Sequence, residues 1–393
     1  MPQEPNQARQ LFPDQIRGIA LLGIVLVNAP VMAIGLYGFD QASVEGGINR
    51  VAAFLVTMLA QTKFYLLFSF LFGYSSMFII RDDTRPRRRV YRRRLLALFI
   101  LGVLHYVFLF IGDILVAYAV LGMALMLMFK RKNKTLLITA IAVWVVATLL
   151  GLLAAASIWL VPSDVELTNE LDEIGAGYAT AMSSGTFFET AWARVELLPI
   201  VLSNSALVVG FVFVAFCLGL LGARHQLLNR LPEFALFFRR AAIWGLAIGL
   251  PIQFALTWLI LGPGKVVGAD ASTTQQALQI LLALLAPILT LGYIGAFATL
   301  ALNRPRSLRF LAAPGRASLT IYLGESLLLC LIFCGWALGL FGQLGAADVT
   351  VIAFVTWGAL AIATTWWLKR FSQGPIEILV SRATKGPLRN ALN

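Results

Sequence analysis

Apolar stretches long enough to cross a bilayer, roughly twenty residues each, recur along the whole chain between short polar and charged segments. Bilayer hydrocarbon forces backbone polar groups to be satisfied within the segment, so these stretches predict transmembrane helices. A transmembrane β-barrel would show short segments of alternating polarity instead. We predict ten spans: Ile16–Gly38, Val51–Ile80, Leu95–Ile111, Ile114–Phe129, Thr135–Val161, Ile200–Gly222, Ala241–Leu261, Gln276–Leu302, Ala317–Leu340 and Val349–Leu368.

Two segments depart from this regular pattern. The second predicted span is longer than a bilayer requires and carries Gln61, Thr62 and Lys63 partway along, so we expect it to be tilted, kinked or broken there. The segment 162–199 is rich in acidic residues, and Arg194 is its one basic residue. Its later part, Phe187–Leu198, places apolar side chains at helical spacing, which predicts an interfacial helix over the outer face.

Composition and charge agree with a membrane protein. Hydrophobic residues make up 59% of the chain and charged residues 13%, and the mean hydropathy is +0.83. These values exclude a soluble globular enzyme, a disordered chain and a disulfide-rich secreted module. With a cytoplasmic N-terminus, 27 of the 31 Lys and Arg residues fall on the inner side, which predicts that both termini are cytoplasmic. The net charge of +12 therefore reflects membrane topology, and we expect no nucleic-acid partner.

The chain reads as one integral membrane domain, residues 1–393. We expect a cytoplasmic N-terminal segment at 1–15, an extracytoplasmic loop at 162–199 and a cytoplasmic tail at 369–393. The first span is longer than a signal-peptide core and nine more follow it, so we interpret it as uncleaved. The three cysteines lie in apolar segments and are interpreted as core residues.

Ionisable residues inside the spans are the first candidates for a functional site. His105 lies in the third span, past the midplane, as a satisfied core residue or as a proton-handling group. Asp113 follows a tight turn and is either a helix N-cap or a functional residue. Eight residues of helical rise would separate the two side chains by about 12 Å, so we expect Asp113 to act indirectly.

Other polar side chains are also costly at these positions. Lys63 is too deep to reach the surface easily and needs a facing acid, and Glu325 in the ninth span is the candidate, beside Tyr322. We therefore hypothesise a buried pair of Lys63 and Glu325. Asn28 lies near the midplane of the first span, where its amide requires partners.

Arginines gather at the predicted inner face. Arg17 opens the first span as an interfacial anchor. The run that includes Arg92 and Arg93 either sets the membrane topology and attracts anionic lipid headgroups, or binds a polyphosphate ligand. The chain has no Walker loop, kinase motif set, nucleophile elbow or zinc-protease motif, and we expect no metal site.

Taken together and in order, several motifs resemble the YeiB family of bacterial membrane proteins, over nearly the whole chain. They are Asp14-x-x-Arg17-Gly18 through Asn28, Lys63-Phe64-x-x-Leu-Phe-Ser69, His105 with Gly112-Asp113, external Tyr178, Gly185, Glu189 and Arg194, Gly315-Arg316-x-Ser318-Leu319-Thr320-x-Tyr322 through Ser326, and Trp367 with Gly374-Pro375-x-Glu377. The chain departs from the family at Ile321, where an amide is usual, and at Glu325, where a glutamine is usual.

The YeiB family is similar to transmembrane acyltransferases. This resemblance implies a helical bundle in which cytoplasmic acyl-CoA enters and a membrane-embedded histidine acts on an acceptor at the far side. His105 would then be general base or acyl carrier, with Asp113 as a second catalytic residue. Arginines would hold the CoA phosphates, and other polar residues would contact the substrates. The phosphate-binding candidates are Arg92, Arg93 and Arg316, and the substrate-binding candidates are Arg17, Asn28, Lys63, Tyr322, Glu325 and Arg194.

The polar residues leave a second function open, a transporter or flippase of a lipid or small anion, because ionisable residues at depth also suit ion-coupled translocation. Clear inverted repeats would favour transport, and the sequence shows none. A structural scaffold is a third interpretation, which the cost of idle buried charges argues against. We expect acyl-CoA, an unknown envelope acceptor and membrane lipids as partners, a possible homodimer, and a place in the bacterial cytoplasmic membrane.

Overall fold

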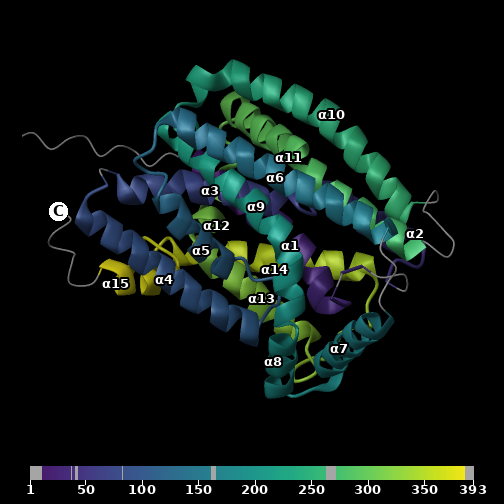
Figure 1. Cartoon of the computed structure of the whole chain (residues 1–393). Coiled ribbons are helices and arrows are strands. Elements are labelled where there is room, and N and C mark those ends of the chain that lie inside the picture. Colours follow the sequence, from purple (N-terminus) through teal and green to yellow (C-terminus); the bar gives the residue numbers. More distant parts are fainter. Residues whose placement is uncertain are drawn as a thin grey trace, which may run out of the picture.

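The computed structural model describes residues 11–36, 38–39, 43–81, 83–160, 165–262 and 271–385. Within these ranges the chain is helical and has no strands (Figure 1). Two short 3-10 turns, η1 (Leu231–Phe234) and η2 (Arg309–Leu311), join longer helices. The α-helices are α1 (Phe12–Ala33), α2 (Gly47–Leu59), α3 (Lys63–Ile80), α4 (Arg85–Phe108), α5 (Leu115–Met126), α6 (Asn133–Leu160), α7 (Val165–Ser184), α8 (Phe187–Glu196), α9 (Leu198–Arg224), α10 (Ala235–Leu261), α11 (Ala271–Asn303), α12 (Ala312–Arg316), α13 (Ser318–Phe333), α14 (Ala346–Trp367) and α15 (Pro375–Lys385).

The fold is that of an all-α membrane protein. Six helical segments of the described chain are long and apolar enough to span a bilayer, namely α1, α2 with α3, α6, α10, α11 and α14. The bent segment that ends in α13 makes a seventh if it is counted as one span. The predicted total of ten also needs α4, α5 and α9. The first ten residues of α4 are rich in arginine and α5 has 12 residues, so neither meets a simple length-and-hydropathy criterion.

The expected irregularity in the second span is a break between two helices. α2 ends at Leu59 and α3 begins at Lys63, and between them Thr62 has a left-handed backbone with φ of 75°. The ninth span differs more from its prediction. α12 and α13 meet at 82°, and α13 ends at Phe333 rather than at Leu340, because the chain turns sharply after Cys334.

The outer segment contains two helices where the sequence predicts one. α8 confirms the predicted helix over Phe187–Leu198 and begins with a capping box, in which Thr186 and Glu189 satisfy each other's backbone N–H groups. α7 was not predicted, since its composition is largely polar. Positions 1–10, 162–164, 265 and 386–393, which belong to the predicted termini and outer loops, lie outside the described residues.

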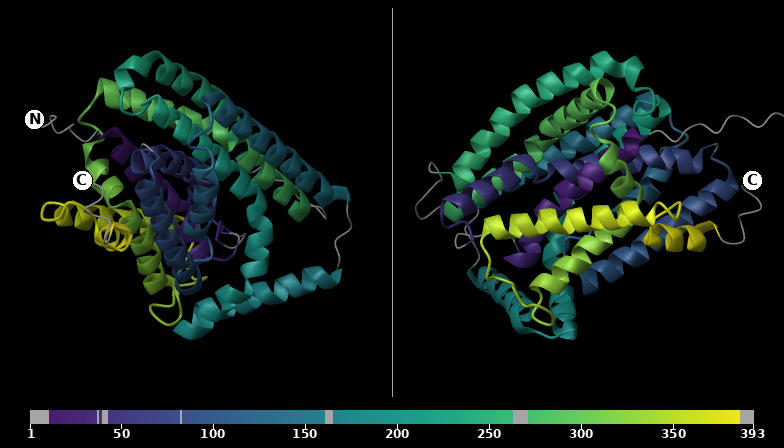
Figure 2. Two further views of the ribbon diagram at one scale, coloured as in Figure 1. Left: turned by 60° about the vertical axis from the view of Figure 1, so that its left-hand side comes forward. Right: turned by 180° about the vertical axis from the view of Figure 1, so that it is seen from behind.

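The helices form a layered bundle around α1. Figure 2 shows α10, α11 and α6 on one side, with α13, α14 and α15 on the other. α3 packs along α9 at a close approach, because a Cβ at Gly73 would collide with the Phe216 carbonyl oxygen and one at Gly219 with that of Phe70. α10 and α11 approach in the same way through Gly245. Small residues that let backbones meet are typical of membrane helix pairs.

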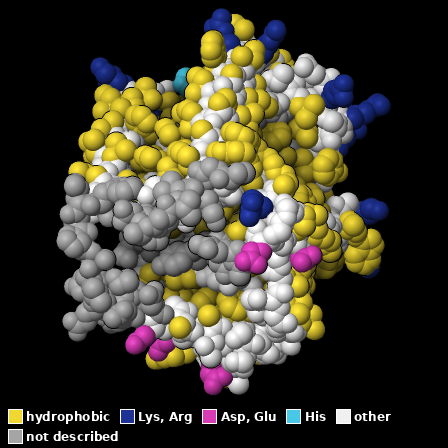
Figure 3. All heavy atoms as spheres, turned by 90° about the vertical axis from the view of Figure 1, so that its right-hand side faces the viewer, with side chains coloured by type: hydrophobic (Ala, Val, Ile, Leu, Met, Phe, Trp, Pro, Cys, Tyr) yellow, Lys and Arg dark blue, Asp and Glu magenta, His cyan; other side chains and the backbone are white. Residues whose placement is uncertain are grey.

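Charges separate between the two ends of this bundle. The arginine-rich start of α4 lies near the start of α1 and α15, because Arg17, Arg94 and Glu377 line one cavity. Figure 3 shows the opposite end, where acidic side chains gather over the lower half of the face and basic ones lie mostly at its rim. The positive-inside rule predicts that the arginine-rich end faces the cytoplasm.

Candidate functional site

His105 is at the centre of a buried polar cluster near the end of α4. Its Nδ1 lies 2.9 Å from Asp113 Oδ1, and both side chains are buried. The expectation that Asp113 acts only indirectly is therefore wrong. The 12 Å rise applies to a continuous helix. α4 ends at Phe108, and the following turn brings Asp113 back beside the imidazole.

Asp113 has two hydrogen-bond partners, one at the start of α5 and one in the polar cluster. Its Oδ2 accepts the Val116 N–H at 2.9 Å, as a residue at the start of α5 does, while its Oδ1 contacts His105. An ionised carboxylate only accepts hydrogen bonds, so Nδ1 of His105 carries the proton. His105 Nε2 is then an acceptor, and it lies 2.8 Å from Ser326 Oγ.

α13 supplies the other side of the cluster. Tyr322 places its ring 4.9 Å from the His105 ring, between centroids, and its hydroxyl accepts the Ile114 N–H at 3.3 Å. Ser326, one turn further along, contacts His105 directly. Tyr322 was predicted as a site residue and Ser326 was not. The available signal for Ser326 was its place at the end of the motif that begins at Gly315 and includes Tyr322.

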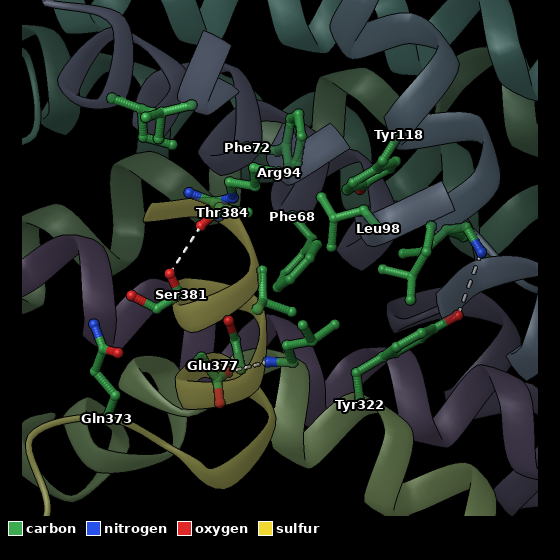
Figure 4. A pocket seen from close by; sticks show the side chains of 17 residues that line it. Phe68, Phe72, Arg94, Leu98, Tyr118, Tyr322, Gln373, Glu377, Ser381 and Thr384 are labelled. Atoms are coloured by element: carbon green, nitrogen blue, oxygen red, sulfur yellow. Dashed lines mark hydrogen bonds between the residues drawn. The ribbon is translucent and has the colours of Figure 1, made fainter. Parts of the chain in front are cut away.

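A cavity of about 300 Å³ leads up to this cluster and ends at Tyr322 (Figure 4). Residues of α3, α4, α5, α13 and α15 line it. The wall near the cluster is formed by Leu98, Ile114, Tyr118 and Tyr322, the middle by Phe68 and Phe72, and the far part by Arg94, Ser318, Gln373, Glu377, Ser381 and Thr384.

A second cavity of about 300 Å³ adjoins the first at its far end. The two share Phe68, Phe72, Arg94, Ser318 and Glu377 among their lining residues. The second adds four polar residues at the arginine-rich end, which are Arg17, Ser75, Arg316 and Ser372. Together the cavities connect an arginine-lined mouth with the ring of Tyr322.

The arginines at this mouth differ in how strongly they are engaged. Arg17 pairs with Asp14 at 2.7 Å and contacts Ser75, and Arg316 donates to the Ser372 carbonyl at 2.9 Å while its buried Nε has no acceptor. Arg94 lines both cavities and makes no hydrogen bond or ion pair with any described residue.

The predicted phosphate ligands Arg92 and Arg93 line neither cavity, and Arg92 is exposed. Arg94 is the residue of that run that faces inward, because Val90, Arg94 and Leu98 share one face of α4 and all three line the first cavity. The four-residue spacing of Val90, Arg94 and Leu98 is visible in the sequence. It does not single out Arg94, because five other arginines lie close to it in the run.

Glu377 of α15 holds the base of the site together. Its Oε1 accepts the N–H groups of Leu319 at 2.6 Å and Thr320 at 3.3 Å, and its Oε2 accepts the Thr320 hydroxyl at 2.5 Å. The carboxylate therefore caps the start of α13, where unpaired N–H groups favour negative charge. α15 is fixed in this way as a wall of both cavities.

The hypothesised pair of Lys63 and Glu325 does not form. Lys63 is fully buried, and its Nζ donates to the Thr57 carbonyl at 3.0 Å. That carbonyl is free because the break after α2 diverts the Gln61 N–H to Val56. Glu325 is 2% exposed, and neither carboxyl oxygen has a hydrogen-bond partner among the described residues. Neither residue lines the two cavities, and neither does Asn28.

Arg194 is fully buried away from both cavities. Its guanidinium donates to the Phe108 carbonyl at 3.2 Å and lies 3.5 Å from Met182 Sδ and 3.6 Å from Cys334 Sγ. It thus connects α8 to the end of α4 and to the end of α13. Its position supports the turn that follows His105 and does not place it in either cavity, where a substrate-binding residue would lie.

An ion pair outside the spans fixes the loop at the arginine-rich end. Asp83 accepts hydrogen bonds from Arg88 Nε at 2.5 Å and its terminal nitrogen at 2.7 Å, and Lys130 lies 3.7 Å away. The guanidinium of Arg88 holds the pKa of Asp83 below its usual value. Within the described residues, no group of His, Cys, Asp and Glu is arranged to hold a metal ion.

Comparison with known proteins agrees with the motifs. The family model "Protein of unknown function (DUF418)" matches residues 222–387. The chain is 27% identical to the uncharacterized protein YxaH of Bacillus subtilis (strain 168), over 94% of this chain and 93% of that protein. It is also 27% identical to the uncharacterized protein YeiB of Escherichia coli (strain K12), over 96% of each.

A third relative, an uncharacterized 39.9 kDa protein from the amylase 3' region of Bacillus acidopullulyticus, is 26% identical over 93% of this chain and 90% of its own length. No solved structure matches the chain. The full-length matches include His105 and Asp113, which precede the segment that the family model covers. The comparisons therefore support the predicted resemblance to the YeiB family, and residues 222–387 match the DUF418 family.

Proposed function

We propose that the protein transfers an acyl group from cytoplasmic acyl-CoA to an acceptor at or beyond the membrane. One observation carries the proposal. Two adjoining cavities run from an arginine-lined mouth to Tyr322, whose ring lies against the buried pair of His105 and Asp113. A path that begins with anion-binding groups and ends at a base fits a donor with a phosphate-rich head and a reactive acyl end.

The mouth has the chemistry to hold phosphates. A guanidinium presents a planar set of donors that forms paired hydrogen bonds with phosphate oxygens. Arg94 makes no hydrogen bond or ion pair among the described residues, so a phosphate would not have to displace one. Arg17 and Arg316 line the same cavity and add positive charge on either side of it.

The size of the inner cavity suits the narrow part of such a donor. About 300 Å³ is at the lower limit of the usual ligand-site range of roughly 300–1,000 Å³. The inner cavity would therefore admit an acyl thioester arm, whereas the nucleotide head would remain in the outer cavity and at its mouth. The apolar side chains Phe68, Phe72 and Leu98 match an arm with little charge.

The inner end has the chemistry to move a proton. His105 Nε2 is a hydrogen-bond acceptor, and a positioned imidazole can take the proton of a hydroxyl or amine as that group attacks a carbonyl carbon. Asp113 would fix the orientation of the ring and stabilise the imidazolium that forms. Burial strengthens both effects, because the site excludes water.

Ligand binding to matched arginine variants tests the donor assignment. In purified wild-type protein, acyl-CoA should raise the melting temperature, since a ligand at about 100 times its Kd adds about 2.7 kcal/mol to the stability. Arg94→Gln should weaken this binding about tenfold or more, because it removes a charge-assisted contact of roughly 1.5–3 kcal/mol. Arg92→Gln is the matched control, because Arg92 lies two positions away on α4, is exposed and lines neither cavity. This variant should bind acyl-CoA as the wild type does.

Two outcomes of this experiment would contradict the donor assignment. Equal loss of binding in both arginine variants would place the phosphates on the protein surface. Absence of any shift with acyl-CoA or free CoA would contradict acyl-CoA as the donor. We further propose that the protein lies in the bacterial cytoplasmic membrane and that its acceptor is an envelope molecule; both relatives named above come from bacteria.

Transport of a lipid or small anion is the second candidate, and Lys63 and Glu325 favour it. Each is buried without an opposite charge as hydrogen-bond partner, and such residues often mark ion pathways in membranes. Flux of a substrate through reconstituted vesicles without any covalent change would select this function. The acyltransferase proposal predicts a covalent change that depends on His105.

A further inference from the structure

Three side chains from separate segments form one hydrogen-bonded line. Ser326 Oγ lies 2.8 Å from His105 Nε2, and His105 Nδ1 lies 2.9 Å from Asp113 Oδ1. This is the order of nucleophile, base and orienting carboxylate in a catalytic triad, which is recognised by geometry and roles and recurs on unrelated folds. Ser326 has no nucleophile-elbow motif around it, so a motif search does not find it.

The protons are placed as a nucleophilic serine requires. Asp113 has its second oxygen occupied by the Val116 N–H, so the carboxylate is held in place on both sides. With Nδ1 protonated, Nε2 accepts and the Ser326 hydroxyl donates. The other acceptor near Ser326 is the Tyr322 carbonyl at 3.5 Å, a much longer contact. The hydroxyl proton therefore already points toward the base.

The face of α13 that lines the cavities leads to this serine. Ser318, Tyr322 and Ser326 are four residues apart and lie one above another on the helix. Ser318 lines both cavities and Tyr322 lines the inner one, so Ser326 lies one turn beyond the end, a rise of about 6 Å. The side chain of Tyr322 stands between them, and a single hydrogen bond of 3.3 Å from the Ile114 N–H holds its hydroxyl.

We infer that Ser326 is the nucleophile that carries the acyl group between donor and acceptor. The inference rests on the proposed function and goes beyond it, because acyl transfer by His105 alone needs no serine. It requires Tyr322 to swing aside when the acyl arm enters. This movement frees the Ile114 N–H as a donor for the carbonyl oxygen, where the negative charge of the tetrahedral intermediate develops.

In the first step, Ser326 Oγ attacks the carbonyl carbon of the thioester while its proton passes to His105 Nε2. The C–S bond breaks, and the imidazolium returns that proton to the CoA sulfur. The products are free CoA and an acyl ester on Ser326. Asp113 keeps its negative charge throughout and stabilises the imidazolium.

In the second step, a hydroxyl or amine of the acceptor loses a proton to His105 Nε2 and attacks the ester carbonyl. The bond from the carbonyl carbon to Ser326 Oγ breaks, and the imidazolium gives the proton to this oxygen. The enzyme is regenerated with the acyl group on the acceptor. A covalent intermediate lets a donor and an acceptor approach from opposite sides of the membrane without occupying the site together.

The test uses purified full-length protein and two acyl donors, with peptide mass spectrometry to locate the acyl group. Acetyl-CoA requires the arginine-lined mouth, whereas p-nitrophenyl acetate is a small activated ester that does not. The variants are Ser326→Ala, Ser326→Cys and His105→Ala. Ser76→Ala is the matched control, since Ser76 is an equally buried serine that donates to the Gly73 carbonyl 2.6 Å away and has no contact with His105.

We expect p-nitrophenyl acetate to acetylate Ser326 in the wild type and in Ser76→Ala. Ser326→Ala should carry no acetyl group at this position, and His105→Ala should be acetylated at least 100-fold more slowly. Ser326→Cys should be acetylated on sulfur, with a product that hydroxylamine cleaves under mild conditions. This variant keeps a nucleophile in the same place and so separates lost chemistry from lost folding.

Two results would overturn the inference. One is an acetyl group on His105, or on neither residue, after reaction of the folded wild type with p-nitrophenyl acetate. The other is a Ser326→Ala protein that transfers acetyl groups from acetyl-CoA at the wild-type rate, which leaves the acyltransferase intact without a serine intermediate. Labelling of Ser326 by the ester but not by acetyl-CoA supports the nucleophile and contradicts the donor of the proposed function.

Discussion

At the level of single residues, the account depends on the position of one proton on His105. Asp113 fixes it, and the same carboxylate also accepts an N–H group at the start of α5. The sequence directs attention to His105 because an ionisable residue inside a span is costly. It does not reveal Ser326, because serines are common in spans and many, such as Ser157 and Ser203, bond to their own helix. The contact of Ser326 with His105 joins residues 221 positions apart and depends on packing.

Asp113→Asn tests the proton assignment. Asparagine is a good residue at a helix start, so the fold should persist. Its amide can donate to Nδ1, which would move the imidazole proton to Nε2 and abolish the base. We expect the rate of CoA release from acyl-CoA to fall about 10²–10⁴-fold with little change in melting temperature. An Asp113→Asn protein with the wild-type rate would show that the carboxylate does not orient His105.

Arg194→Lys separates a structural role of Arg194 from acceptor binding. Lysine keeps the charge but not the fork that reaches both the Phe108 carbonyl and the sulfur atoms. We expect a loss of about 2 kcal/mol in stability, measured as a lower melting temperature. Arg230→Lys, at a surface arginine that is 54% exposed, should melt as the wild type does. A normal melting temperature with a raised KM for the acceptor would instead return Arg194 to the acceptor site.

At the level of helices, hydropathy predicts the long apolar helices that could span a bilayer, but not the shorter or more polar helices that pack around them. The long helices, the break before Lys63 and the helix over Phe187–Leu198 agree with the sequence. α7 and α15 were missed because neither contains an apolar stretch of membrane length. α15 matters most, since it supplies Glu377 and forms part of the cavity wall. Its position depends on the contact of Glu377 with the N–H groups at the start of α13, which no local sequence pattern predicts.

The close contact of α3 and α9 gives a prediction at this scale. Gly73→Ala should destabilise the protein by about 1–3 kcal/mol, because its Cβ would meet the Phe216 backbone, which cannot move without separating the helices. Gly358→Ala is the control, since a Cβ at that α14 position has no neighbour within 4 Å. Thermal unfolding in detergent measures both. Equal melting temperatures for the two variants would show that α3 and α9 are further apart.

At the level of the whole molecule, the arginine-rich end of the bundle is also the end where the two cavities begin. The arginine-rich end holds the mouth of the cavities, and the path ends at Tyr322, whose ring lies against the imidazole of His105. Positive-inside counting predicts the orientation from the sequence, but not that Arg94, rather than Arg92 or Arg93, lines the path. That distinction arises from the rotation of α4 against α3, α5 and α15.

Low pH should reduce the stability of the protein, because protonation of Asp83 removes its ion pair with Arg88 at the arginine-rich end. Arg88 lowers the pKa of this carboxyl in the folded protein, so its ion pair contributes stability above the unfolded pKa of about 3.9. That contribution should be lost as the pH falls from there through the lower folded pKa. Asp83→Asn keeps a residue that tolerates the left-handed backbone at φ of 57° and removes the charge.

The measurement is the difference in melting temperature between wild type and Asp83→Asn at a series of pH values. The wild type should melt higher near neutral pH, and the two should converge in acid. A constant difference across the whole range would show that the carboxylate and its arginine do not stabilise this loop.

The rate of CoA release from acyl-CoA in reconstituted protein tests the central claim most directly. The comparison is wild type, His105→Ala and His225→Ala, the last being the chain's other histidine, which is exposed. We predict that wild type and His225→Ala release CoA at the same rate. His105→Ala should bind acyl-CoA equally well and release CoA at least 100-fold more slowly. Release by His105→Ala at the wild-type rate would contradict the assignment of this site to acyl transfer.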